Sequence, residues 1–151
     1  MNYEYFMSLA LKEAGKAYLS NEVPVGAVIV KNNKIIARAH NLIKTKKDPT
    51  AHAEILAIRK ASKKIKNECL LDTNLYVTVE PCSMCVGAII HSRINKLIIG
   101  ANDPKTGACG SAFRIINSKK SNHKIIVKKG VLKKECSDII KKFFQKKRKA
   151  G

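Results

Sequence analysis

Two short segments carry residues that could bind a metal ion and move a proton. The first, AHAE, places His52 two residues before Glu54 at the start of an apolar helical pattern. The second, PCSMC, places Cys82 and Cys85 three residues apart at the start of another such pattern. Cysteines at this spacing project from one side of a first helical turn, where the helix dipole favours thiolates. Zinc is the usual ion for such a sulfur pair.

His52 is the natural third ligand. Two thiolates and one imidazole leave a tetrahedral zinc ion one position short, and a position held by water is typical of catalytic sites. Neither a second CxxC nor a nearby His-x-x-x-His completes a closed set. Glu54 would then stand beside the ion and carry protons. Taken alone, Glu54 would be an acid that complements the helix dipole, and a lone CxxC would fit a redox motif.

The elements that must position these residues follow from periodicity and turn signals. The sequence predicts helices over about 3–20, 51–64 and 83–92, and a basic amphipathic helix over about 132–148. It predicts a hairpin over 23–40 and strands at 75–80, 96–101 and 124–130. An exposed loop is expected at 41–50 and another loop at 102–115. Strands that alternate with helices indicate a layered α/β fold, and the hairpin makes the five-stranded sheet mixed. The inner face of the last helix is predicted to include Cys136, Ile139, Ile140, Phe143 and Phe144.

Length and composition indicate one domain over residues 1–151, with no linker and no repeat. No apolar run is long enough to cross a bilayer, and the N-terminus lacks the features of a signal peptide, so we expect a cytoplasmic protein without a membrane segment. Five cysteines, an odd number, favour metal binding over disulfides. Cys69, Cys109 and Cys136 are expected to be small buried apolar side chains.

The charge of the chain is strongly positive. Lys and Arg total 30 against 11 acidic residues, which gives a net charge of +19. Such a balance suits a polyanion such as nucleic acid. A lysine-rich composition bias or a solvated lysine face explains the charge equally well, so the charge alone leaves the partner open.

Longer segments of the chain, including those around the two motifs, are similar to those of a known family. NEVPVGAVIV, KDPTAHAEI, LYVTVEPCSMCVGAIIHSRI and DPKTGACGS resemble the zinc-dependent cytidine/adenosine deaminase superfamily, and within it the bacterial tRNA-specific adenosine deaminases, over nearly the whole chain. The resemblance implies a single zinc-dependent deaminase domain with a three-layer α/β/α cytidine-deaminase-like fold. It also implies one Zn²⁺ per subunit, held by His52, Cys82 and Cys85.

The same resemblance implies the reaction and its partners. The wobble adenosine of a tRNA would be hydrolysed to inosine with release of ammonia, and Glu54 would carry the protons. Asn41 would read the purine edge, helped by the backbone N–H of Ala53 and the apolar side chain of Val25. Without the family, Asn41 would be taken for an ordinary turn residue. The enzyme would be a homodimer acting on an anticodon stem-loop, mainly that of an arginine tRNA.

Family resemblance also suggests where RNA is contacted. The candidate RNA-binding residues are Asp103, Lys105, Ser111, Phe144, Lys146, Lys147 and Arg148. The first three fit a capped turn equally well. Two rival functions share most of these features. One is a deaminase of a free nucleobase or nucleoside, such as cytosine or guanine, and the other is a non-catalytic RNA-binding module stabilised by zinc.

Overall fold

The computed structural model describes residues 2–121 and 123–150. The helices are α1 (Tyr3–Leu19), α2 (Ile43–Lys46), α3 (Ala53–Ile65), α4 (Ser83–His91) and α5 (Lys133–Ala150). The strands are β1 (Gly26–Lys31), β2 (Lys34–His40), β3 (Thr73–Val79), β4 (Lys96–Ala101) and β5 (Ile126–Lys128). No helix in this described part of the chain is both long and apolar enough to span a membrane.

The five strands form one mixed sheet in the order β2-β1-β3-β4-β5. β1 is antiparallel to both β2 and β3, whereas β3, β4 and β5 are parallel to one another. Asn32 and Asn33 form the hairpin turn with φ of 51° and 61°, the positive φ that a tight two-residue turn requires. The predicted mixed sheet, with its hairpin, is therefore confirmed.

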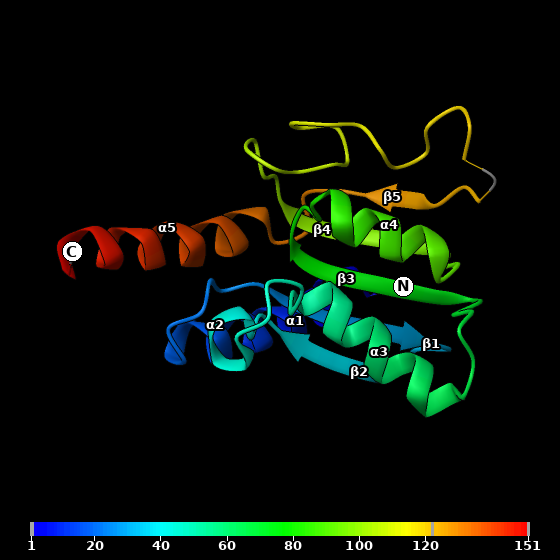
Figure 1. Ribbon diagram of the computed structural model, residues 1–151, viewed down its shortest axis with the longest axis horizontal. Helices are drawn as coiled ribbons and strands as arrows, with labels where there is room; N and C mark the ends of the chain where they lie inside the picture. Colours follow the sequence, from blue (N-terminus) through cyan, green and yellow to red (C-terminus); the bar gives the residue numbers. More distant parts are fainter. Residues whose placement is uncertain (1, 122, 151) are drawn as a thin grey trace.

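Helices cover both faces of the sheet. Figure 1 shows α3 and α4 in front of the sheet and α1 behind it, while α5 extends beyond the strands towards the C-terminus. One apolar core lies under α3 and α4, and a second lies between the sheet, α1 and α5. Contact between α1 and β1 is close at Gly26, where a Cβ would lie 2.0 Å from the Ala10 carbonyl oxygen. A side chain at Gly26 would therefore push α1 away from the sheet.

Strand directions decide where the connecting segments begin. Because β2 and β3 are both antiparallel to β1, they run in the same direction, and β4 runs with them. The carboxyl ends of these three strands therefore lie at one edge of the sheet, which we call the carboxyl edge. Helices α3 and α4 and the loop at 102–115 all follow these strand ends. Ligand sites of open α/β sheets lie at such an edge.

Three sequence predictions are wrong in detail. The exposed loop predicted at 41–50 contains the short helix α2, because the buried carboxylate of Glu22 accepts hydrogen bonds from the N–H groups of Lys44 and Thr45 at 3.1 and 2.7 Å. The last strand spans only three residues. Phe144 is not on the inner face of α5: it is 44% exposed, whereas its neighbour Phe143 is 4% exposed.

Tyr76 occupies the centre of the core beneath α1. Its ring lies 5.4 Å from that of Phe6 and 6.5 Å from that of Tyr3, measured between centroids. Among the residues that the structure describes, its hydroxyl is the buried side-chain polar atom without a hydrogen-bond partner. Burial raises the pKa of Tyr76 to about 12. A buried hydroxyl without a partner is unfavourable because it has lost its hydrogen bonds to water.

Tyr76→Phe should therefore stabilise the protein. We expect the free energy of unfolding, measured by urea denaturation, to rise by about 1 kcal/mol, since the ring is kept and the unpaired hydroxyl is removed. Tyr3→Phe is the matched control. The Tyr3 hydroxyl accepts a hydrogen bond from Lys96 Nζ at 2.9 Å, so its loss should lower stability slightly. A loss of stability in Tyr76→Phe would show that its hydroxyl has a partner.

Candidate metal centre and adjoining groove

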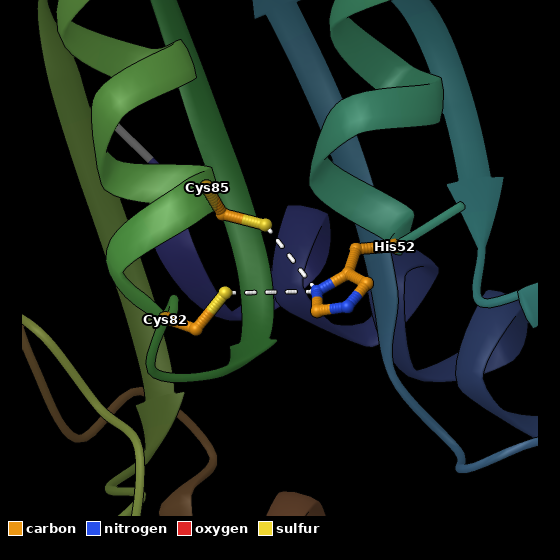
Figure 2. A group of neighbouring side chains, drawn as sticks. All are labelled: His52, Cys82 and Cys85. Carbon is orange, nitrogen blue, oxygen red and sulfur yellow. Dashed lines mark hydrogen bonds between the residues drawn. The ribbon is translucent and has the colours of Figure 1, made fainter. Parts of the chain in front are cut away.

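His52, Cys82 and Cys85 come together at the carboxyl edge. His52 Nδ1 lies 3.7 Å from Cys82 Sγ and 3.5 Å from Cys85 Sγ (Figure 2). Within the described ranges 2–121 and 123–150, these three residues form the group of His, Cys, Asp and Glu side chains whose ligand atoms could hold a metal ion, all within 4.8 Å of one another. Zn–S bonds of about 2.3 Å and Zn–N bonds of about 2.0 Å in a tetrahedron place S and N about 3.5 Å apart. The atom set therefore fits zinc.

The local fold leaves these side chains free to bind a metal. His52 and Cys82 are the N-cap residues of α3 and α4, and neither side chain caps its own helix. The cap of α3 comes from Asn41, whose Oδ1 accepts the N–H of Ala53 at 2.8 Å. Asn41 thus satisfies the N–H of the first residue of α3 from outside the helix, and the His52 imidazole, which makes no cap hydrogen bond, points towards the cysteines.

The electrostatics of the three residues suit a cation. Hydrogen bonds from Cys85 and His52 stabilise the Cys82 thiolate and, against the effect of burial, lower the pKa of Cys82 to about 4. That thiolate and burial raise the pKa of Cys85 above its ordinary value. The hydrogen bond with Cys82 raises the pKa of His52. The site thus holds negative charge on one sulfur, and a bound cation would displace the protons from the other two ligands.

Glu54 lies in the first turn of α3 beside these ligands. Its side chain is buried, with 4% of the residue exposed. Burial raises the pKa of Glu54 to about 7, although its own backbone N–H and the charge of His52 favour the ionised form. A carboxyl group with a pKa near neutrality can both accept and donate a proton there, which is what a proton carrier needs.

The predicted base-contacting residues are neighbours in the structure. The backbone N–H of Asn41 donates to the Val25 carbonyl oxygen at 3.1 Å, and the Asn41 side chain is buried against Ala53. The N–H of Ala53 is already engaged by Asn41 Oδ1, so it would contact a base only by sharing or giving up that hydrogen bond. The roles of Asn41, Ala53 and Val25 in binding a base stay predictions.

The predicted RNA-binding residues fall into different surroundings. Asp103 caps a turn, because its carboxylate accepts the N–H groups of Lys105 and Thr106 at 3.1 and 3.2 Å. The Ser111 hydroxyl donates to the buried carboxylate of Glu80. Lys146 lies over the Tyr18 ring, 5.5 Å from its centroid.

The remaining candidates meet in one groove of about 500 Å³ between α5 and the loop after β4. Its lining consists of Lys105, Ile140, Lys141, Phe144, Gln145, Lys147 and Arg148. Sequence reasoning missed Lys141 and Gln145. The signal that could have found them is helical spacing, since Lys141, Phe144 and Arg148 are three and four residues apart and share one face.

The other histidines take no part in the metal site. His40 Nδ1 pairs with Glu13 Oε1 at 3.0 Å, and His123 Nε2 bonds the Ile94 carbonyl oxygen at 2.7 Å. His91 is exposed at the end of α4. All five cysteines are free thiols, and Cys109 and Cys136 are buried as expected, whereas Cys69 is only partly buried.

Comparison with known proteins places this geometry in context. The family model of the MafB19-like deaminases matches residues 1–148. The chain is 51% identical to the tRNA-specific adenosine deaminase of Haemophilus influenzae, over 96% of its own length and 84% of that protein. It is 46% identical to the enzyme of the same description from Bacillus subtilis, over 97% and 91% of the two chains.

Solved structures show the same relationship. The chain is similar to a structure from a study of tRNA:A34 deaminases, with a TM-score of 0.86 and 44% identity over 89% of this chain and 98% of that one. This similarity confirms the predicted cytidine-deaminase-like fold. A structure of guanine deaminase from Nitrosomonas europaea is also similar, with a TM-score of 0.80 and 25% identity over 93% and 83% of the two chains.

Removing a ligand should remove the metal. We expect His52→Ala and Cys85→Ser to lower the zinc content of the purified protein from about one ion per chain to below about 0.1, because each leaves only two protein ligands. Zinc is measured by elemental analysis after dialysis. Cys69→Ser is the matched control, since Cys69 lies outside the cluster, and it should keep its zinc. Full zinc occupancy in Cys85→Ser would contradict the proposed ligand set.

Proposed function

Because the chain belongs to the MafB19-like deaminases and to the family of tRNA-specific adenosine deaminases, we propose that it deaminates the wobble adenosine of a tRNA. The reaction is a hydrolysis. A C6–O bond forms, the C6–N bond breaks, and water supplies the oxygen of inosine. One proton of that water goes to ring N1 and the other leaves with the amine as ammonia. The observation that carries this proposal is the buried Glu54 beside three metal-ligand atoms, in a chain 51% identical to such an enzyme.

Four residues of the chain have distinct roles in the proposed reaction. His52, Cys82 and Cys85 would hold Zn²⁺, which when bound supplies a Lewis acid that lowers the pKa of water towards about 7. Glu54 takes a proton from the attacking water and delivers it to N1, then passes a second proton to the departing amine. Its buried position keeps that proton near the substrate and not in bulk water.

Recognition of the substrate uses two further parts of the carboxyl edge. Asn41 reads the purine edge beside Val25 and Ala53, as the family resemblance implies. The groove between α5 and the loop after β4 presents Lys105, Lys147 and Arg148 to phosphates of the anticodon stem-loop, with the exposed Phe144 available to stack on a base. Cys82 pairs with Gly107 in an isolated β-bridge, and this bridge ties the loop that carries Lys105 to the metal site.

The finer partner assignments rest on the family alone. We propose that the enzyme works as a homodimer with one Zn²⁺ per subunit, that RNA contacts both subunits, and that an arginine tRNA is its main substrate. We also propose the cytoplasmic location expected from the sequence and a single domain over residues 1–151. The RNA-contacting roles of Asp103, Ser111 and Lys146 are proposals of the same kind.

Glu54→Ala separates catalysis from metal and RNA binding. Wild-type protein incubated with total tRNA should produce inosine, detected by sequencing as an adenosine-to-guanosine change at the wobble position. Glu54→Ala should keep zinc and RNA affinity but lose at least about 10²-fold in rate, the range that a general acid–base contributes. Glu68→Gln, an exposed acid outside the site, should behave as wild type. Full activity in Glu54→Ala would exclude Glu54 as the proton carrier, whereas wild-type protein that binds zinc and RNA but forms no inosine would favour the non-catalytic RNA-binding module.

Salt dependence distinguishes a tRNA deaminase from a deaminase of free bases. If the four cations of the groove each contact a phosphate, affinity for an anticodon stem-loop should fall about 50- to 150-fold between 50 and 200 mM salt. Lys141→Ala should make the slope of log K against log salt shallower by about 0.7–0.9. Lys34→Ala, at the exposed hairpin turn, should leave the slope unchanged. Turnover of free adenosine, cytosine or guanine as fast as that of tRNA would exclude our proposal.

A further inference from the structure

Glu80 is a buried carboxylate that the reaction does not use. It lies between β3 and Pro81, and only 3% of the residue is exposed. Both carboxylate oxygens accept hydrogen bonds from the loop that follows β4. Oε1 accepts the N–H of Asp103 at 3.1 Å and the hydroxyl of Ser111, and Oε2 accepts the N–H groups of Cys109 and Ser111 at 2.9 and 3.2 Å. Four donors of one loop therefore converge on a single side chain.

The loop also contacts the backbone on both sides of this carboxylate. The N–H of Ala108 donates to the Pro81 carbonyl oxygen at 2.8 Å, and Gly107 pairs with Cys82. A Cβ at Gly107 would lie 2.6 Å from Glu80 Oε2 and 2.5 Å from the Asp103 carbonyl oxygen. The carboxylate and the loop thus fit together without room for a side chain at position 107.

No cation shares this work. Over residues 2–121 and 123–150, no Lys, Arg or His forms an ion pair with Glu80, so N–H and O–H groups make its direct hydrogen bonds. A glutamine at this position would replace one acceptor oxygen by an NH₂ group facing N–H donors. An NH₂ in place of Oε2 would leave the N–H groups of Cys109 and Ser111 without an acceptor, and one in place of Oε1 would do the same to the N–H of Asp103.

We propose that Glu80 is a positioning residue that fixes the loop 103–111 on the turn that carries Cys82, and thereby sets Lys105 opposite α5 for RNA binding. The RNA-binding part of this inference rests on the proposed function. It gives Ser111 a structural role besides the RNA contact suggested by family resemblance, since its hydroxyl donates to Glu80 and holds the loop in place. Because the loop acts on substrate binding, loosening it should weaken binding more than it slows the chemical step.

Glu80→Gln tests this role, with Glu68→Gln as the same chemical change at an exposed position. We expect amide hydrogen exchange at Asp103, Cys109 and Ser111 to become at least about tenfold faster, because their acceptor is weakened. The KM for an anticodon stem-loop should rise about tenfold while kcat stays within about threefold of wild type. Zinc content should be unchanged. Glu68→Gln should alter none of these quantities.

Each other outcome has a definite meaning. Unchanged amide exchange, or an unchanged KM, would overturn the proposal, and loss of zinc would show that Glu80 acts on the metal site instead of the loop. If Glu80→Gln does not fold, Ser111→Ala is the milder test, because it deletes the hydroxyl and with it one of the four hydrogen bonds to Glu80, while the N–H at position 111 is kept. Ser111→Ala should still accelerate amide hydrogen exchange at Asp103 and raise the KM for the anticodon stem-loop by about threefold. If either quantity stays unchanged in this variant, the proposal is overturned. Absence of inosine formation by wild type would refute the proposed function, while the exchange measurement would still decide whether Glu80 holds the loop.

Discussion

The common direction of β2, β3 and β4 is the constraint on which the site depends. Since β1 is antiparallel to β2 and to β3, the chain leaves both of those strands at the same edge, and α3 and α4 begin there side by side (Figure 1). His52 and Cys82, thirty residues apart, are the residues at which these two helices begin. If either strand ran the other way, one helix would start at the opposite edge and the three ligand atoms could not meet.

Buried acceptor side chains hold the segments that follow these strands. Asn41 caps α3 from a position twelve residues earlier, Glu22 caps α2, and Glu80 binds the loop after β4. In each case a side chain distant in sequence satisfies N–H groups that would otherwise be buried without a partner, a loss that costs about 1–3 kcal/mol for each group. The segments around the metal ligands are loops and helix starts, yet these hydrogen bonds hold them in one arrangement.

Local patterns predicted the ligands and the framework but could not predict these long-range contacts. Residue type and spacing were enough to predict His52 and the two cysteines as candidate metal ligands. The alternation of strands and helices, with the turn signal of the hairpin, was enough to predict the mixed sheet. The pattern around residues 41–50 is polar, and nothing within it reveals that Glu22 induces a helical turn there. On α5, apolar periodicity placed Phe143 and Phe144 on one inner face. Neighbouring helical residues point about 100° apart, and packing against Tyr18 buries Phe143 alone.

The distribution of acids explains how a strongly basic protein keeps carboxylates where its chemistry and its loops need them. Of the 11 acidic residues, Glu13, Glu22, Glu54 and Glu80 are buried. Three of these four accept hydrogen bonds that, against the effect of burial, lower their pKa values, whereas burial raises the pKa of Glu54. Removing these acids from the surface leaves lysine and arginine to dominate the charge that an approaching polyanion meets. Such a field attracts any RNA, so under the proposed function the selection of one adenosine would depend on the side chains at the carboxyl edge and not on the charge.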